Sequence, residues 1–216
     1  FNIDKSNEIF LDNFCLNDLY SIELQTSIFR IKENALSNCS RLTLFNVTCD
    51  NDIVINRNTF NGCDSLKNVF LISSSRIILM NSCFSNINKL DSLLVDCERF
   101  HFDIDLFKNG ISVSNFSLRC QTDINAFIFS NCDSFNEINL ESDSSIILSP
   151  RSFENTKKLI SIILKANSII IKEDCFINCQ SFKYFKIHES NFVTIENFIF
   201  YKCDDLQNVY IAINSN

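Results

Sequence analysis

The chain repeats one pattern of apolar positions at intervals of 22 to 24 residues. Each copy contains an apolar anchor, usually Phe, that is followed two positions later by Asn in most copies. The anchors are Leu36, Phe60, Phe84, Phe107, Phe129, Phe153, Phe176 and Phe200. Successive anchors lie 24, 24, 23, 22, 24, 23 and 24 residues apart, and an imperfect earlier copy runs from Ile9 to Leu24. A fixed period of this length indicates a repeat architecture of about nine coils.

Two short strands are predicted in each coil. Six, nine and eleven residues after an anchor stand apolar residues, as in Leu66, Val69 and Leu71. The last two share one face of a strand because side chains alternate along it, and the three together form the L-x-x-L-x-L core of a leucine-rich repeat. A second alternating pair, such as Ile53 and Ile55, precedes the anchor by seven and five residues. No sustained helical period is present, so few helices are expected.

Stacking explains why such coils need one another. One coil cannot bury its own apolar edge, whereas coils stacked at the strand spacing of about 4.8 Å bury a continuous column. The anchors should form an interior spine, and Phe84, Phe107 and Phe129 should lie inside. The Asn residues at 38, 86, 109, 131, 155 and 178 should form a ladder in the turns. A β-sandwich with irregular strand spacing is the alternative, but it would not repeat the Phe-x-Asn turn.

The full unit, Phe-x-Asn-Cys-x-x-Leu/Phe-x-x-φ-x-φ (φ is an apolar residue), occurs from Phe129 to Leu140 and from Phe176 to Ile187. In this unit the sequence resembles the BspA-like leucine-rich repeats of bacterial surface antigens and of parasitic protists. The resemblance spans about residues 9 to 213. It implies a curved solenoid with a parallel sheet on its concave face, and a role in adhesion or protein binding. The Gly and Pro that usually separate the strands are mostly missing, since the chain has 2 Gly and 1 Pro.

Residues 1–216 are therefore predicted to form a single leucine-rich-repeat solenoid, as a segment of a longer array. Solenoids need terminal caps, because an uncapped end exposes apolar core and unpaired strand amides. Neither end of the sequence shows such a cap. We expect that the array continues or that another chain covers the ends, for example by end-to-end stacking.

The composition of the chain limits the classes of partner that we expect. The formal net charge is -7, and no run of Lys or Arg marks a phosphate-binding stripe, so nucleic acid is not an expected partner. No stretch approaches 18 uninterrupted apolar residues, which argues against membrane insertion by this segment. A protein partner is the remaining expectation.

Most of the 11 cysteines fall at repeated positions. Five occupy the position three residues after the anchor, where another coil has Ile87, so the position is interpreted as an apolar core slot. These five are Cys39, Cys63, Cys132, Cys179 and Cys203. Cys97 and Cys120 share a second position in adjacent coils, within disulfide range at Cα but with parallel Cβ directions. Reduced thiols are favoured over disulfides.

Catalysis has little support in the sequence. Nucleophilic chemistry would need His101 or His188 beside a nucleophile, yet His101 should point outward from the second strand and His188 should lie just past the first. No C-x-x-C zinc pair is present, and Gly62 and Gly110 cannot make a Gly-rich phosphate loop. We therefore expect no enzyme, no cofactor, no catalytic residue and no metal site.

The outward positions of the first strand are the candidate binding surface, because they line the concave face. Apolar residues there need explanation, and exposed apolar patches often mark interfaces. Leu44, Phe70, Ile72 and Leu94 fall on three consecutive coils and are the predicted partner-binding residues. The alternative is a concave face narrow enough to bury them without a partner. Three glycosylation sequons, at Asn38, Asn46 and Asn115, are weak evidence of secretion.

The sequence thus favours a non-catalytic protein-binding or adhesion module that presents a concave recognition surface. The alternative is an intracellular structural scaffold protein assembled with other chains. Two localisations stay open: the family resemblance favours the cell surface, whereas the expected reduced cysteines and the lack of a visible signal peptide favour the cytoplasm.

Overall fold

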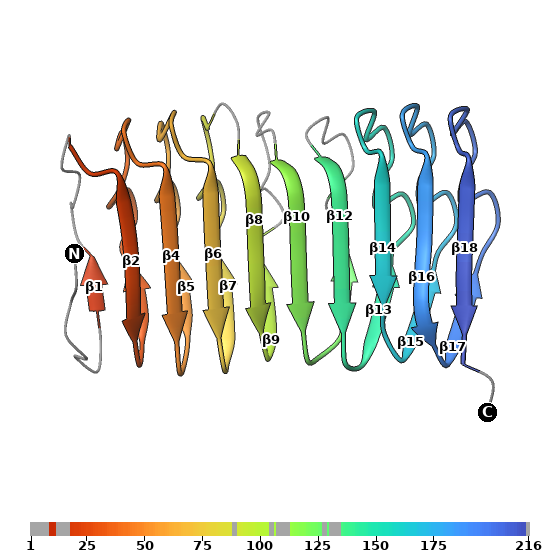
Figure 1. Cartoon of the computed structure of the whole chain (residues 1–216), viewed down its shortest axis with the longest axis horizontal. Helices are drawn as coiled ribbons and strands as arrows, with labels where there is room; N and C mark the ends of the chain where they lie inside the picture. The colour runs from red at the N-terminus through yellow and green to blue at the C-terminus, as the bar shows by residue number, and fades with distance from the viewer. Residues whose placement is uncertain are drawn as a thin grey trace. The chain divides into compact units, whose positions relative to one another are not determined.

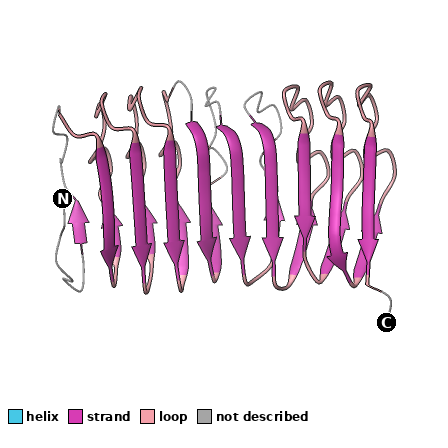
Figure 2. Ribbon diagram, viewed as in Figure 1, coloured by secondary structure: helices cyan, strands magenta, loops and turns pink. Residues whose placement is uncertain are grey.

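The structure, a computed structural model, describes residues 9–11, 18–87, 90–103, 106, 113–126, 129 and 135–214. All regular elements among these residues are β-strands, and each strand runs parallel to the strands beside it (Figures 1 and 2). The chain divides into two compact units, Phe1–Val113 and Ser114–Asn216, which are described separately. One solenoid of about nine coils over residues 1–216 stays a prediction.

Unit 1 contains two sheets. The long strands β2 (Ser21–Thr26), β4 (Leu44–Cys49), β6 (Asn68–Ser73) and β8 (Leu90–Cys97) form one sheet in that order. The short strands β1 (Ile9–Leu11), β3 (Phe29–Ile31), β5 (Ile53–Ile55), β7 (Arg76–Leu79) and β9 (Arg99–Phe102) form the other. Each coil contributes one strand to each sheet, so the prediction of two strands per coil is confirmed.

Unit 2 repeats this arrangement. Its long strands are β10 (Val113–Cys120), β12 (Phe135–Ser142), β14 (Ser161–Lys165), β16 (Tyr184–Ser190) and β18 (Asn208–Ile213). Its short strands are β11 (Ile124–Ala126), β13 (Ser145–Leu148), β15 (Ser168–Ile171) and β17 (Phe192–Ile195). Equivalent repeat positions pair strand to strand: Ile162 lies opposite Phe185, and Ile146 lies opposite Ile169.

The anchors form the interior column that the sequence predicts. Phe84 is 0% exposed and Phe129 is 3% exposed, whereas Phe107 lies outside the described residues. In unit 1 the ring centroids of Phe60 and Phe84 are 5.3 Å apart. In unit 2 the Phe153 ring lies 4.9 Å from Phe129 and 5.0 Å from Phe176, in each case nearly parallel to it. Ring-to-ring packing therefore joins successive coils within each unit.

Two left-handed residues in each described turn explain its Asn bias. Positive φ occurs two residues before the anchor and two residues after it, where Asn costs less than most residues. The first set is Asn34, Asn58, Ser82, Arg151, Asp174 and Phe198, and the second is Asn38, Gly62, Asn86, Asn155, Asn178 and Lys202.

Hydrogen bonds also link the turns of successive coils. The backbone N–H of Asn38 donates to the Asn61 carbonyl at 2.8 Å, and the N–H of Asn178 donates to the Tyr201 carbonyl at 2.9 Å. The predicted Asn ladder is present between Asn178 and Asn155, whose side chains are 2.6 Å apart. Asn109 and Asn131 lie outside the described residues. The left-handed backbone is thus a second reason for Asn at these positions, besides its side-chain hydrogen bonds. The sequence pattern alone did not distinguish the two reasons.

The cysteine position after the anchor is buried, as expected, but it is also a hydrogen-bonding position. The thiol of Cys63 donates to the Leu36 carbonyl at 3.1 Å, and that of Cys179 donates to the Phe153 carbonyl at 3.0 Å. In another coil the Thr156 hydroxyl takes the same place, 2.9 Å from the Phe129 carbonyl. The interpretation as a purely apolar slot was therefore incomplete: the side chain fills the core and satisfies the anchor carbonyl of the preceding coil. Cys132 lies outside the described residues.

A second group of cysteines occupies the inner side of the bend between the long and the short strand. Cys49 lies opposite Thr26 and Ser73 in the sheet register. Burial of the thiol, with Asp50 beside it, raises the pKa of Cys49 to about 12. At a different position, directly before the anchors Phe84 and Phe176, burial also raises the pKa of Cys83 and of Cys175. Because the thiolate is the reactive form, these thiols should be inert in the folded protein.

Candidate protein-binding face

Strand alternation divides each long strand of unit 1 into an inner and an outer row. In β4 the inward Phe45 and Val47 are 0% exposed, while the side chains on either side of them are half-buried. In β6 the inward Val69 and Leu71 are likewise fully buried, and Phe70 between them faces outward. The L-x-x-L-x-L pattern thus fixes which side chains of these strands face outward.

The sheet register brings the four predicted binding residues together on this outer side. Phe70 of β6 lies directly opposite Leu94 of β8. Ile72 follows two residues after Phe70 on the same face, and Leu44 of β4 lies on the neighbouring strand, opposite Asn68. Opposite residues in a sheet are about 5 Å apart at Cβ, and diagonal neighbours are about 7–8 Å apart. We call Leu44, Phe70, Ile72 and Leu94 the outer apolar patch.

The patch is partly accessible. Ile72 is 39% exposed, and Leu44, Phe70 and Leu94 are half-buried. Its immediate neighbours on the same face are polar or acidic: Glu23, Asn46, Thr48 and Asn68. None of the strands β2, β4 and β6 contains Lys or Arg. The arrangement is a small apolar surface with an uncharged to acidic border.

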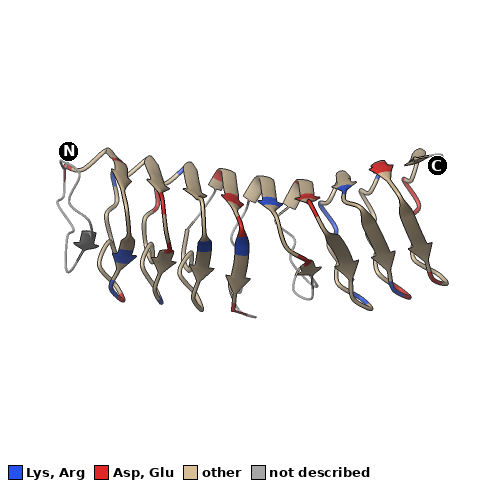
Figure 3. Ribbon diagram, turned by 90° about the horizontal axis from the view of Figure 1, so that it is seen from below, with Lys and Arg blue, Asp and Glu red and all other residues tan. Residues whose placement is uncertain are grey.

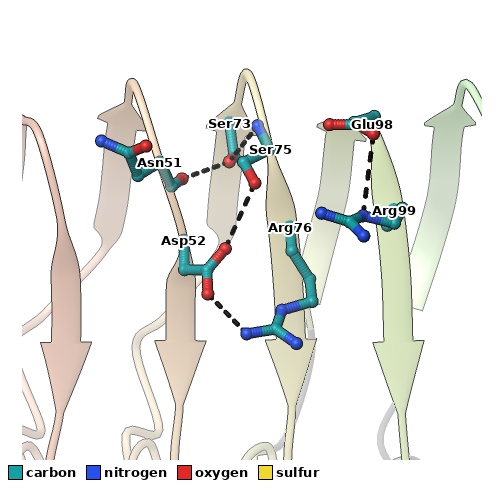
Figure 4. Close-up of polar contacts among 7 residues, drawn as sticks. All are labelled: Asn51, Asp52, Ser73, Ser75, Arg76, Glu98 and Arg99. Atoms are coloured by element: carbon teal, nitrogen blue, oxygen red, sulfur yellow. Dashed lines mark hydrogen bonds and ion pairs between the residues drawn. The ribbon is translucent and has the colours of Figure 1, made fainter.

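A polar network holds the bend just beyond the patch (Figure 4). The Ser73 hydroxyl, at the end of β6, donates to the Asn51 carbonyl and accepts the Ser75 N–H at 3.0 Å. Asp52 accepts the Ser75 hydroxyl at 3.3 Å and an Arg76 N–H at 2.6 Å. These bonds join the coil of β4 to the coil of β6 where both leave the long-strand sheet. The network fixes the strands that carry Phe70 and Ile72, and nothing in the sequence pattern singled it out.

Unit 2 has the same bend. The Ser142 hydroxyl donates to the Thr122 carbonyl at 2.8 Å, and Asp123 accepts the hydroxyls of Ser144 and Ser145 at 2.7 and 2.6 Å. The Ser145 bond, followed by the Ser144 bond, lowers the pKa of Asp123. The bend is therefore a structural feature of the repeat. It does not distinguish one unit as a binding site.

The outer face of unit 2 differs from that of unit 1. Lys165 of β14 donates to Glu141 of β12 at 3.0 Å. Lys186 of β16 lies 5.3 Å from the ring of Tyr210 in β18 (Figure 3 shows the charged positions of each unit). His188, predicted just past the first strand, lies within β16, because that strand continues to Ser190. The strand pattern alone underestimated the length of β16, which contains a register irregularity after Ile187.

The candidate chemistry of the remaining polar groups is limited. His101 is exposed on β9, as expected, with Nε2 3.9 Å from an Asp103 carboxylate oxygen. Within the described residues, no group of three or more His, Cys, Asp or Glu side chains is arranged to hold a metal ion. A shallow depression of about 300 Å³ lies at the bend of unit 1, lined by Ile28, Arg30, Asn51 and Asp52 and by none of the four patch residues. No helix long and apolar enough to cross a membrane occurs in the part of the chain that the structure describes.

The family described as "BspA type Leucine rich repeat region" matches residues 7–121 and 100–216, with 6 copies. The chain belongs to the BspA-type leucine-rich-repeat family. A leucine-rich repeat protein from Bacteroides ovatus, known from a crystal structure, is 17% identical, with 88% of this chain and 69% of that chain covered and a TM-score of 0.34. A search of curated proteins gives no match. Repeats of this family generally mediate protein binding or adhesion and are typically non-catalytic.

Proposed function

We propose that this chain is a non-catalytic protein-binding module and that the outer apolar patch of unit 1 is its contact surface. The observation that carries the proposal is the alignment of Phe70 with Leu94 on the solvent side of the sheet, with Ile72 next to them. The inward residues already supply the core, so these side chains are not needed to close it. Apolar side chains that gather on one solvent-facing surface are typical of an interface.

The patch has features expected of the centre of a protein interface. A Phe ring surrounded by smaller apolar side chains provides a large contact area, and polar neighbours can form the rim. The sheet also holds the side chains on a rigid support, so little conformational entropy is lost on binding. A cell-surface adhesion role and an intracellular scaffold role would both use such a surface. The proposal here is protein binding itself.

The test compares the proteins captured from source cells by the wild-type chain and by two double variants. Phe70→Ser with Leu94→Ser removes the centre of the patch. Asn139→Ser with Ile163→Ser alters two residues that lie opposite each other on the outer face of unit 2 and serves as the matched control. We expect a defined set of proteins to be lost with the first variant and kept with the second. Equal capture by all three folded proteins would contradict the proposal.

A further inference from the structure

Unit 1 has a second outward face, on the short strands that lie behind its long strands (Figure 1). Val54 of β5 and Ile78 of β7 are half-buried on the outward side of this sheet, and the register places them directly opposite each other. Arg30 of β3 lies on the other side of Val54, and His101 of β9 lies on the other side of Ile78. The outward row of the short strands is therefore an apolar pair between two exposed nitrogen-bearing side chains.

The charges of unit 1 are segregated between its two sheets. The long strands β2, β4, β6 and β8 contain no Lys or Arg, and their charged residues are Glu23, Asp91 and Asp96. The short strands β3, β5, β7 and β9 contain no Asp or Glu, and their Arg residues are Arg30, Arg76 and Arg99. Arg76 is already paired with Asp52 at the bend. Arg99 reaches Glu98 only at 3.7 Å, and 58% of its side chain is exposed.

The two faces correspond to each other coil by coil. If a coil is taken as a long strand and the short strand that follows it, each acidic or apolar position on the long strand has a basic or apolar counterpart on the short strand. The pairs are Glu23 with Arg30, Phe70 with Ile78, and Asp96 with Arg99. Both sheets repeat at the same strand spacing of about 4.8 Å, and packed sheets lie about 10 Å apart. One face can therefore lie over the other with several coils in register.

We propose that the long-strand face of unit 1 packs on the short-strand face of unit 1 in a second copy of this chain. The inference rests on the proposed function, because it names a second copy as the partner of the outer apolar patch. Packing coil on coil brings Phe70 onto Ile78 and Glu23 close to Arg30, so the apolar centre and the charges are matched together. Two long-strand faces would instead bring carboxylates together without a cation on either strand set.

The two faces in contact are different, so each copy keeps one face of each kind for a further copy. Such a heterologous contact does not close at two chains unless its rotation forms a ring. The molar mass of the 216-residue chain, by sedimentation equilibrium or light scattering, should therefore rise beyond that of two chains as concentration increases. Added salt should weaken the association, because the charge pairs at its rim are exposed to solvent.

The decisive test mixes two variants that each lack one face. Phe70→Ser with Leu94→Ser alters the long-strand face, and Val54→Ser with Ile78→Ser alters the short-strand face. Each variant alone should remain at the mass of one chain. An equimolar mixture should give a complex of two chains, because the intact short-strand face of the first binds the intact long-strand face of the second. Thermal unfolding of each variant checks that it is folded.

Two further comparisons separate this contact from a general effect of substitution. Ile147→Ser with Ile170→Ser is the matched control, since these residues lie opposite each other on the outward side of the short strands of unit 2 and are also half-buried. This control should associate like the wild type. Glu23→Arg and Arg30→Glu alter exposed residues, and each should weaken association alone. Mixing the two should restore a complex, because opposite charges then meet.

A wild-type mass of one chain at every concentration would overturn the inference, and so would variants of the two faces that fail to combine on mixing. Neither result touches the proposed function, which is tested by capture of proteins from source cells. The proposed function fails if Phe70→Ser with Leu94→Ser captures the same proteins as the wild type, and the inference then fails with it.

Discussion

The long-strand sheets of the two units have nearly the same inner face and different outer faces. Inside, both present fully buried apolar side chains, such as Val69 in β6 and Ile162 in β14. Outside, unit 1 presents Phe70 beside Leu94, whereas unit 2 separates its apolar side chains with charges such as Lys165 and Glu141. The inner face is constrained by stacking of coils, and the outer face is not. The similarity between the units therefore follows from the fold, and the difference between their outer faces is what the binding proposal rests on.

The largest expected effect is a loss of stability, and it tests whether the inner faces of the two units are alike. Phe60→Ala in unit 1 and Phe153→Ala in unit 2 each remove a ring that is fully buried against neighbouring anchors. Each should lower the free energy of unfolding by about 3–5 kcal/mol, as other buried Phe deletions do. Urea unfolding measures this. A loss confined to one variant would show that the two inner columns are not equivalent.

The next effect concerns the hydrogen bond to the anchor carbonyl of the preceding coil. Thr156 donates it in one coil, and Cys63 and Cys179 donate it in others. Thr156→Val keeps the shape of the side chain but removes the hydroxyl that donates to the buried Phe129 carbonyl. One hydrogen bond contributes about 0.5–1.5 kcal/mol net, so Thr156→Val should lower the free energy of unfolding by about that amount, whereas Thr156→Cys should restore most of it. Urea unfolding of both variants is the measurement. If Val and Cys are equally tolerated, the position is an apolar slot after all.

A third effect appears only in alkaline solution. The Cys49 thiol has a folded-state pKa of about 12, above its ordinary value of 9.0, so folding keeps it protonated. Its contribution is fully present below pH 9 and is lost as the pH rises towards 12, because the unfolded thiol ionises first. Cys49→Ser should flatten the decline of stability between these values, as measured by denaturant unfolding at successive pH values. A decline unchanged by the variant would assign it to other groups.

The smallest expected effect on stability tests the difference between the units. Phe70→Ser on the outer face of unit 1 and Ile163→Ser on that of unit 2 alter half-buried side chains. Each should change the free energy of unfolding by about 1 kcal/mol or less, as surface substitutions usually do. Thermal unfolding of both variants is the check. A loss as large as that of Phe60→Ala would place Phe70 in the core and remove its role as an interface residue.

Much of the fold could be predicted from the sequence, because stacking imposes the same requirement on every coil. The anchors, the two strands and the inward residues all follow from the 22 to 24 residue period. The bonds between coils could not be predicted so easily. Arg76 binds Asp52, and the thiol of Cys179 donates to the Phe153 carbonyl. Both bonds join residues about one coil apart, so they depend on the register between coils. The positive φ of Asn38 and Asn178 could not be recognised from the sequence. Asn is favoured both by a left-handed backbone and by side-chain hydrogen bonds, so its presence does not distinguish the two.

The candidate site was predictable in place, and its role stays a proposal. Strand alternation was enough to put Leu44, Phe70, Ile72 and Leu94 on one outer face, and the register brings Phe70 and Leu94 together. Which molecule contacts them depends on shape and chemistry that a periodic pattern does not encode.

The most direct test of the binding proposal is photo-cross-linking in the source cells. A benzophenone amino acid replaces Phe70 on the outer face of unit 1 in one protein and Asn139 on that of unit 2 in another. Illumination followed by mass analysis should give a defined cross-linked protein partner from position 70 and none from position 139. Cross-linking of the same proteins with equal yield from both positions, or only from position 139, would contradict the proposal that unit 1 presents the binding face.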